Sequence, residues 1–196
     1  MRYHIGDLDH QKLRDLYTGM LKPRMIEEKM LILLRQGKIS KWFSGIGQEA
    51  ISVGVTQALK KEEYILPMHR NLGVFTSRNI PLHRLFAQWQ GKQSGFTQGR
   101  DRSFHFGTQE QYNCENLADR AKGYGMESRI IDGNNILEVY TKVDELCKAM
   151  RKRPRPMLLE FKTFRMRGHE EASGTKYVPE KLMSKWAKQD PIANYE

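Results

Sequence analysis

The residues best suited to chemistry lie in one polar loop near the C-terminus. Arg165, Arg167 and His169 follow an apolar run, Leu158–Thr163, whose composition predicts a buried strand. In open parallel sheets, ligands bind beyond the carboxyl ends of the strands, because loops and helix N-termini converge there. A histidine exchanges protons near neutral pH, and neighbouring arginines favour anionic ligands. The loop therefore predicts acid–base chemistry on an anion; the alternative is a solvated surface loop with an incidental histidine.

Three other places in the sequence could take part. Arg70, between a short extended piece and an apolar helix, is either a phosphate clamp or an exposed arginine at a helix start. The glycine-rich turn at residues 44–47 opens a predicted helix, and such turns leave backbone N–H groups free for an anion. His105 stands between Phe104 and Phe106. These neighbours support a histidine held by packing at least as well as a catalytic one.

The first half of the chain is predicted to be helical. Apolar residues recur at helical spacing, with Asp9 as an N-cap and with Pro23 and Pro81 in the first turns of helices. We expect helices over residues 10–20, 24–36 and 82–90, and another that follows the glycine-rich turn and ends near residue 59. Gly54 inside that helix predicts a close approach to another element. Residues 92–108 lack this periodicity, which predicts a linker or a functional loop.

The second half of the chain alternates between strand and helix patterns. The predicted order is a short helix (116–122), a strand (126–131), a long amphipathic helix (136–152), a strand (157–164) and a closing helix (180–188). The central three elements form a βαβ unit, whose parallel strands need a right-handed crossover. Such a unit places Asp132 and the His169 loop at the same edge of the sheet.

Composition sets the broad class of the protein. The chain has 196 residues, of which 39% are hydrophobic and 29% charged, as in folded domains rather than disordered chains. We find no apolar run of membrane-spanning length and no apolar signal-peptide core at the start. Two cysteines without a CxxC pair argue for a reduced compartment and against a disulfide framework or a zinc ribbon.

The formal charge of +10 is compatible with nucleic acid, acidic metabolites or an acidic partner surface. The basic residues are spread along the chain apart from one cluster at Arg151–Arg155. No RRM, KH, zinc-finger or homeodomain signature accompanies that cluster. A nucleic-acid-binding domain is therefore the less favoured class.

Taken in order, several motifs resemble the alpha subunit of the thiamine-diphosphate-dependent 2-oxo acid dehydrogenases of the branched-chain and pyruvate type. The most specific are GQEA (47–50), within the string GIGQEAISVG (45–54), and TFRMRGH (163–169). The weaker ones are RMIEEKMLILLRQGKI (24–39), HRNLGVFTSRNIPLHRLFAQWQGK (69–92), RSFHF (102–106) and GYGMESRIIDGNNILEVY (123–140). The resemblance covers nearly the whole chain. It implies an α/β fold in which a helical N-terminal part precedes a parallel sheet with helices on both faces.

The resemblance also implies roles for individual residues. His169 matches the active-site loop histidine, which orients and protonates intermediates and helps transfer the acyl group to lipoamide. Arg70 matches the arginine that grips the cofactor diphosphate, and His69, where relatives usually have tyrosine, stands as a second donor. His105 matches a histidine near the substrate pocket, and Arg165 an arginine that braces the catalytic loop.

Two departures from the family pattern stand out. Glu170 follows the loop histidine where regulated mitochondrial relatives have a phosphorylatable serine, which indicates a bacterial, cytoplasmic enzyme without kinase control. The family's Gly-Asp-Gly…Asn motif, whose oxygens hold Mg²⁺ at the diphosphate, is absent. The similarity passes from Phe106-Gly107-Thr108 straight to Gln109, so we expect a missing central βαβ region near 108–109. The predicted parts are then a helical region (1–91), an active-site or linker loop (92–108) and an α/β remnant (109–196).

The resemblance further implies the reaction and the partners. We expect oxidative decarboxylation of a 2-oxo acid with thiamine diphosphate and Mg²⁺, and transfer of the acyl group to a lipoyl-bearing acyltransferase core. The string HEEASGTKYVP favours branched-chain substrates, with pyruvate as the alternative. A beta subunit or a fused beta-like half, as in a heterotetramer, would complete the active site, so this chain alone is expected to be inactive. A phosphate-ligand enzyme without thiamine, a basic nucleic-acid-binding domain and a non-catalytic scaffold are the alternatives from other classes.

Overall fold

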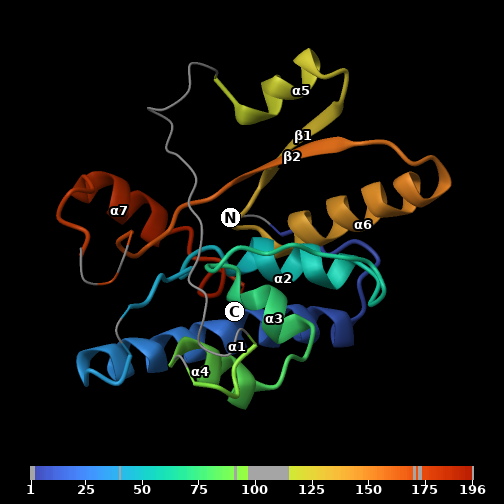
Figure 1. Ribbon diagram of the computed structural model, residues 1–196. Helices are drawn as coiled ribbons and strands as arrows, with labels where there is room; N and C mark the ends of the chain where they lie inside the picture. Colours follow the sequence, from blue (N-terminus) through green and yellow to red (C-terminus); the bar gives the residue numbers. More distant parts are fainter. Residues whose placement is uncertain are drawn as a thin grey trace.

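The computed structural model describes residues 3–39, 41–90, 92–96, 115–169, 171 and 174–195. Within them, the chain forms helices and one pair of parallel strands, and most of the helices lie on one side of that pair (Figure 1). The chain is therefore α/β, with a helical N-terminal part followed by a small parallel sheet, as predicted. His105 and the suspected break near 108–109 lie outside the described residues.

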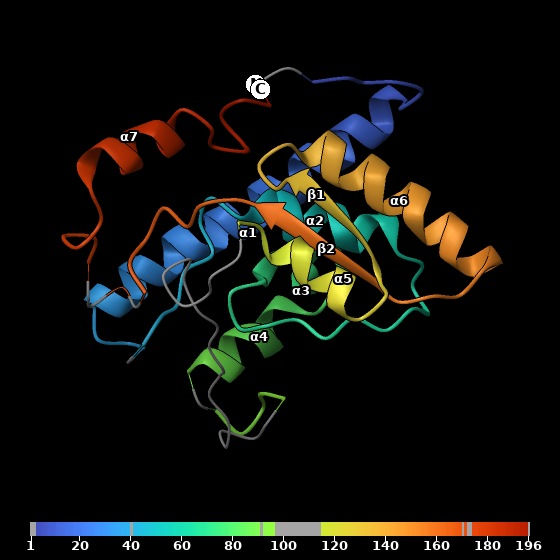
Figure 2. The ribbon, with the colours of Figure 1, turned by 90° about the horizontal axis from the view of Figure 1, so that it is seen from above.

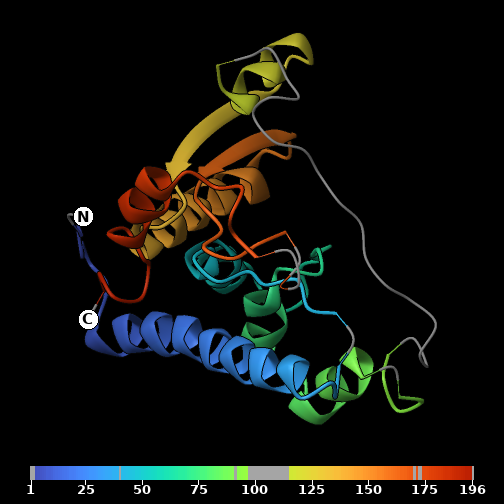
Figure 3. The ribbon, with the colours of Figure 1, turned by 90° about the vertical axis from the view of Figure 1, so that its left-hand side faces the viewer.

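A single long helix, α1 (His10–Arg35), runs along one side of the molecule (Figure 3). Asp9 caps it by accepting a hydrogen bond from the backbone N–H of Lys12 at 2.7 Å. The prediction of two helices divided at Pro23 is wrong, because α1 continues through this proline. Proline removes one helical hydrogen bond, but the turns on both sides of it bury the same face of α1. The buried apolar positions of that face are Leu16, Met20, Ile26, Met30 and Leu31.

Three shorter helices follow: α2 (Glu49–Ala58), α3 (Leu72–Ser77) and α4 (Leu82–Trp89). The first two pack on α1 and on each other. On α4, Trp89 lies edge-on against Trp42, with 5.0 Å between ring centroids. These contacts bury a cluster made of Ile26, Met30, Leu31, Ile39, Trp42 and Leu72. This cluster lies between the second half of α1, α3 and the segment that carries Trp42, whereas the first half of α1 packs with α2 and α6 in a second cluster.

The predicted βαβ unit is confirmed. Strand β1 (Glu127–Asp132) and strand β2 (Met157–Lys162) are parallel, and α6 (Ile136–Lys152) connects them. Asp132 pairs in register with Lys162, so the turn after β1 and the loop after β2 leave the sheet at the same edge. A short 3-10 turn, η2 (Leu117–Asp119), and α5 (Arg120–Gly123) precede β1.

The two parts of the chain meet where α2 packs against α6. A Cβ atom on Gly54 would lie only 2.7 Å from Cγ1 of Val139, so the helices approach as closely as a glycine permits. This confirms the prediction that Gly54 marks a close contact. The same helix α6 covers one face of the strand pair, where Ile131 is buried in a cluster with Val139 and Val143. The division into parts at 1–91, 92–108 and 109–196 stays a prediction.

The last helix, α7 (Glu180–Ala187), leads into a C-terminal segment that returns to α1. Arg24 on α1 forms ion pairs with Glu49 on α2, at 2.6 Å, and with Asp190, at 2.8 Å. The described ends of the chain lie close together (Figure 2), and the rings of Tyr3 and Tyr195 are 5.3 Å apart. The loop that carries His169 is therefore fixed at both of its ends, by β2 and by this C-terminal anchor.

Candidate active site

Arg70 and His169, which are 99 positions apart in the sequence, lie in direct contact. The guanidinium of Arg70 donates one hydrogen bond to the carbonyl of His169 at 2.6 Å and another to the carbonyl of Ser44 at 3.1 Å. Nδ1 of His169 is 3.5 Å from the same guanidinium nitrogen that reaches the His169 carbonyl. The arginine therefore joins the loop before α2 to the loop after β2.

The ring of Phe43 packs against three of the candidate groups. His69 lies edge-on to it, with 5.0 Å between centroids, and His169 does so at 6.0 Å. The guanidinium carbon of Arg70 is 5.4 Å from the centroid of Phe43, within the range of a cation–π contact. Two of the three predicted histidines, His69 and His169, and the predicted arginine Arg70 are thus brought together around one aromatic ring. Sequence reasoning missed Phe43, for which an aromatic residue just before the glycine-rich turn was the only signal.

Two side chains hold the His169 loop in shape. Arg165 donates from Nε to the carbonyl of Arg167 at 2.8 Å. The hydroxyl of Tyr177 accepts a hydrogen bond from the backbone N–H of His169 at 2.9 Å and lies 3.5 Å from a guanidinium nitrogen of Arg165. These contacts fix the backbone of the loop and place the exposed ring of His169 between Arg70 and Phe43. Tyr177 was not predicted, and a lone tyrosine in a polar loop gives no sequence signal.

The site is electropositive. Burial, together with the positive charge of Arg165, lowers the pKa of Arg70 to about 10. No carboxylate among the described residues forms an ion pair with Arg70, whose guanidinium contacts two carbonyls and a histidine nitrogen. A half-buried guanidinium with a second one nearby gains from an anion that neutralises both. The donor set therefore fits a phosphate or carboxylate group.

The glycine-rich turn before α2 supports this site but leaves little for an anion. Its backbone N–H groups are taken up inside the protein: Gly45 donates to Glu27 and Gly47 donates to Glu49, both at 2.8 Å, and Ile46 donates to the Ser44 hydroxyl at 3.1 Å. The expectation of a free anion-binding turn is therefore wrong. The N–H groups that an external anion would need are bonded instead to the buried carboxylates of Glu27 on α1 and Glu49 on α2.

Gly47 has a role that the sequence did not reveal. Its φ of +96° is a conformation that favours glycine. A Cβ atom there would lie 2.7 Å from the carbonyl of Phe164, and the backbone N–H of Met166 donates to the carbonyl of Ile46 at 3.0 Å. The turn before α2 and the segment after β2 thus run side by side, as Figure 3 shows.

The chain is similar to a known protein family over nearly all of its length. The family model described as "Dehydrogenase E1 component" matches residues 17–111 and 103–196. The chain belongs to the dehydrogenase E1 component family. Membership implies thiamine diphosphate as the cofactor of the family in general, and an oxidoreductase that acts on 2-oxo acids.

Among its relatives, 3-methyl-2-oxobutanoate dehydrogenase subunit alpha of Mycobacterium tuberculosis is 26% identical, over 99% of this chain and 72% of the relative. The 2-oxoisovalerate dehydrogenase subunit alpha of Bacillus subtilis is 26% identical, over 100% of this chain and 84% of the relative. The pyruvate dehydrogenase E1 component subunit alpha of Acholeplasma laidlawii is 22% identical, over 96% and 75%. The chain therefore resembles both branched-chain and pyruvate-type E1 alpha subunits.

The turn after β1 in this E1 chain is built for packing. Asp132 accepts a hydrogen bond from the backbone N–H of Asn134 at 2.9 Å. The buried Asn134 side chain donates to the carbonyl of Gln189 at 2.6 Å and accepts from the hydroxyl of Thr163 at 2.7 Å. Asp132 shares the edge of the sheet with the loop after β2, as predicted, but its carboxylate closes its own turn.

Within the described part of the chain, no group of three or more His, Cys, Asp or Glu side chains is placed to hold a metal ion. The sequence also lacks the Gly-Asp-Gly string, so no residue of this chain matches the family's Mg²⁺ ligands. The described helices also include none that is both long and apolar enough to cross a membrane. The predicted role of His105 lies on a residue outside the described part.

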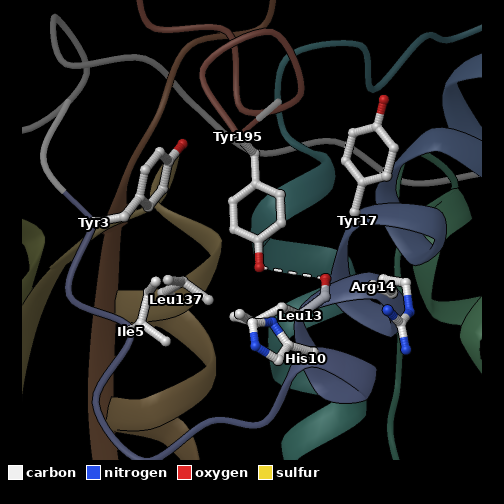
Figure 4. A pocket seen from close by; sticks show the side chains of 8 residues that line it. All are labelled: Tyr3, Ile5, His10, Leu13, Arg14, Tyr17, Leu137 and Tyr195. Carbon is white, nitrogen blue, oxygen red and sulfur yellow. Dashed lines mark hydrogen bonds between the residues drawn. The ribbon is translucent and has the colours of Figure 1, made fainter.

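A separate pocket of about 540 Å³ lies between the N-terminal segment, α1 and the C-terminus (Figure 4). The hydroxyl of Tyr195 donates to the carbonyl of Leu13 at 3.3 Å there. Burial and the negative charge of Asp132 raise the pKa of Tyr3 to about 12. The pocket is lined by Tyr3, Ile5, His10, Leu13, Arg14, Tyr17, Leu137 and Tyr195. None of the candidate site residues lines it.

The basic cluster at the end of α6 is partly neutralised. Arg151 reaches both carboxylate oxygens of Glu63, at 2.8 and 2.7 Å, and Arg155 pairs with Glu127 at 2.9 Å. Charges already paired with carboxylates offer less attraction to phosphates. The cluster therefore gives no support to a nucleic-acid interface.

Proposed function

We propose that this chain is the alpha subunit, or the alpha-like part, of a thiamine-diphosphate-dependent dehydrogenase that decarboxylates a branched-chain 2-oxo acid and passes the acyl group to a lipoyl-bearing acyltransferase. The observation that carries the proposal is the contact between Arg70 and His169 in an electropositive site. An anion clamp beside a proton-exchanging imidazole is what a coenzyme with a diphosphate tail and a proton-transfer reaction requires.

In this proposal Arg70 holds the diphosphate. A guanidinium has five N–H donors in one plane, and Arg70 uses some of them on the carbonyls of Ser44 and His169. The remaining donors can face a phosphate. His69, whose ring also packs edge-on against Phe43, is proposed as a second donor. Arg165 keeps the His169 loop in place and adds positive charge to the site.

His169 is proposed to move the proton. Thiamine diphosphate, when bound, supplies the carbanion and the electron sink for loss of CO₂. The ring of His169 is exposed at the end of a braced loop, so it can exchange a proton with solvent and with the substrate oxygen. His105 is proposed as a further catalytic residue on the strength of the family resemblance alone.

The names of the relatives support the substrate and the partners. Two bacterial relatives are named for branched-chain 2-oxo acids, and a third is named for pyruvate. We therefore favour a branched-chain 2-oxo acid, with pyruvate as the second candidate. All three are called alpha subunits, which supports a beta subunit as partner, and their bacterial sources support a bacterial cytoplasmic location. The alignment with the first extends over 264 positions although this chain has 196 residues, which supports the absence of a central region.

Thiamine diphosphate binding tests the proposal directly. Adding thiamine diphosphate with Mg²⁺ to the purified chain should raise its melting temperature, because a ligand that binds only the folded state stabilises it. Arg70→Ala should abolish the rise, whereas Arg84→Ala on the exposed surface of α4 should not. Steady-state rates on a panel of 2-oxo acids, with the beta partner present, would then rank branched-chain acids against pyruvate. A melting temperature that thiamine diphosphate leaves unchanged would refute the proposal.

A further inference from the structure

A buried carboxylate on α1, Glu27, lies beneath the loop that carries the candidate site. Its side chain is almost fully buried. Oε1 accepts a hydrogen bond from the backbone N–H of Gly45 at 2.8 Å. Oε2 accepts from the indole N–H of Trp42 at 3.2 Å and from the hydroxyl of Ser44. The Glu27 side chain thus accepts hydrogen bonds from three residues of the loop between α1 and α2.

The chemistry of these partners selects a carboxyl group. Two of the three are N–H groups, which can only donate, and they approach different oxygens of Glu27. A glutamine has one carbonyl oxygen and one NH₂ group, so either orientation turns an N–H donor toward another donor. A buried donor without an acceptor costs far more than an average hydrogen bond contributes. The loop therefore keeps its shape only with a group that offers two acceptor oxygens.

The same loop sets the position of Arg70. The carbonyl of Ser44 accepts a hydrogen bond from the Arg70 guanidinium at 3.1 Å. A Cβ atom on Gly45 would lie 2.3 Å from the carbonyl oxygen of Arg70, so the two backbones are in tight contact. Phe43, within the same loop, packs against the Arg70 guanidinium. Any shift of this loop would move the acceptor, the ring and the backbone that hold the arginine.

We infer that Glu27 is a positioning residue for anion binding: it fixes the loop at residues 42–45, and the loop fixes the guanidinium of Arg70. This inference rests on the proposed function, because it assigns Glu27 to the same diphosphate site. Glu27 also contributes a negative charge behind Arg70, which favours the charged guanidinium. The other carboxylate facing Glu27 is Glu49 on α2, and that residue is paired with Arg24.

The test compares inorganic pyrophosphate and thiamine diphosphate affinities of purified full-length variants by calorimetry. Glu27→Gln should weaken both affinities about tenfold or more, since one buried donor loses its acceptor. Glu28→Gln removes the same charge from the next, exposed position of α1 and should change neither. Val143→Ala, in the separate core cluster under β1, lowers stability without touching the loop. It should leave both affinities unchanged, which separates positioning from a general loss of stability.

Ser44→Ala is the second variant, in case Glu27→Gln does not fold. It removes one of the three donors and keeps the carbonyl that binds Arg70, so both affinities should fall by a smaller factor than with Glu27→Gln. Equal affinities in wild type, Glu27→Gln and Ser44→Ala would overturn the inference, as would equal losses in Glu27→Gln and Val143→Ala. If wild type binds neither anion, the proposed function fails instead, so the two failures are distinguishable.

Discussion

Replacing Arg70 with lysine should show whether diphosphate binding depends on the planar geometry of the guanidinium or only on its positive charge. A lysine keeps the positive charge but offers a single ammonium in place of a planar fork. Arg70 donates to two carbonyls, of Ser44 at 3.1 Å and of His169 at 2.6 Å, that lie on different loops. A single ammonium cannot reach both and still face a phosphate with a pair of donors. At least one charge-assisted hydrogen bond is then lost.

Such a hydrogen bond contributes about 1.5–3 kcal/mol, which corresponds to about 10- to 100-fold in affinity. Arg70→Lys should therefore weaken thiamine diphosphate binding by a factor in that range, measured by isothermal titration calorimetry on the purified chain. Arg84→Lys, an exposed arginine on α4 that stacks on Phe96, serves as the matched control and should bind like wild type. If Arg70→Lys and wild type bind thiamine diphosphate equally well, positive charge alone is sufficient and the reasoning from guanidinium geometry is refuted.

Three other predictions concern the same region. His169→Ala should abolish lipoyl acylation by the assembled enzyme while the melting temperature stays near that of wild type; normal turnover would remove His169 from the mechanism. Tyr177→Phe removes the hydroxyl that accepts the His169 N–H, and a hydrogen bond of this kind contributes about 1 kcal/mol. Because the loop is then held less firmly, kcat should fall several-fold, whereas Lys176→Gln should have no effect. Burial raises the pKa of Glu27 to about 7. Because the folded state holds that proton more tightly than the unfolded chain, the free energy of unfolding should fall by about 3 kcal/mol as pH rises from 4.5 to 7 in wild type. In the Glu27→Gln variant, the free energy of unfolding measured by chemical denaturation should not show this fall between pH 4.5 and 7. The same dependence on pH in both proteins would contradict the prediction.

The strongest periodic patterns of the sequence predicted the fold best. The helix at 136–152 has the predicted bounds, and the two strands flanking it are parallel as expected. The break predicted at Pro23 failed because local propensity was outweighed by burial of one continuous face of α1. Helix boundaries and turns depend on such tertiary contacts, which a single sequence does not display.

The candidate site was predictable only in part. His169 and Arg70 stand out because their residue types carry charge or exchange protons, whereas Phe43 and Tyr177 are ordinary aromatic residues until the fold places them beside those two. Glu27 is hidden for a different reason: a glutamate in an amphipathic helix is usually solvated, and its burial follows from packing alone. The glycine-rich turn misled because its N–H groups are bonded inside the protein, to Glu27 on α1 and to the side chains of Ser44 and Glu49 close by in the sequence.

The bond between Arg70 and the carbonyl of His169 also constrains the order of folding. Arg70, Ser44 and Phe43 come from one stretch of the helical half, so they can assemble through contacts that are close along the chain. Their last partner arrives only after β2 has docked beside β1, because His169 follows that strand. Contacts between distant positions in the sequence close late, since they require a long loop to be ordered. A chain interrupted after β1 would thus lack both the carbonyl that binds Arg70 and the α6 residues that complete the core under α1 and α2.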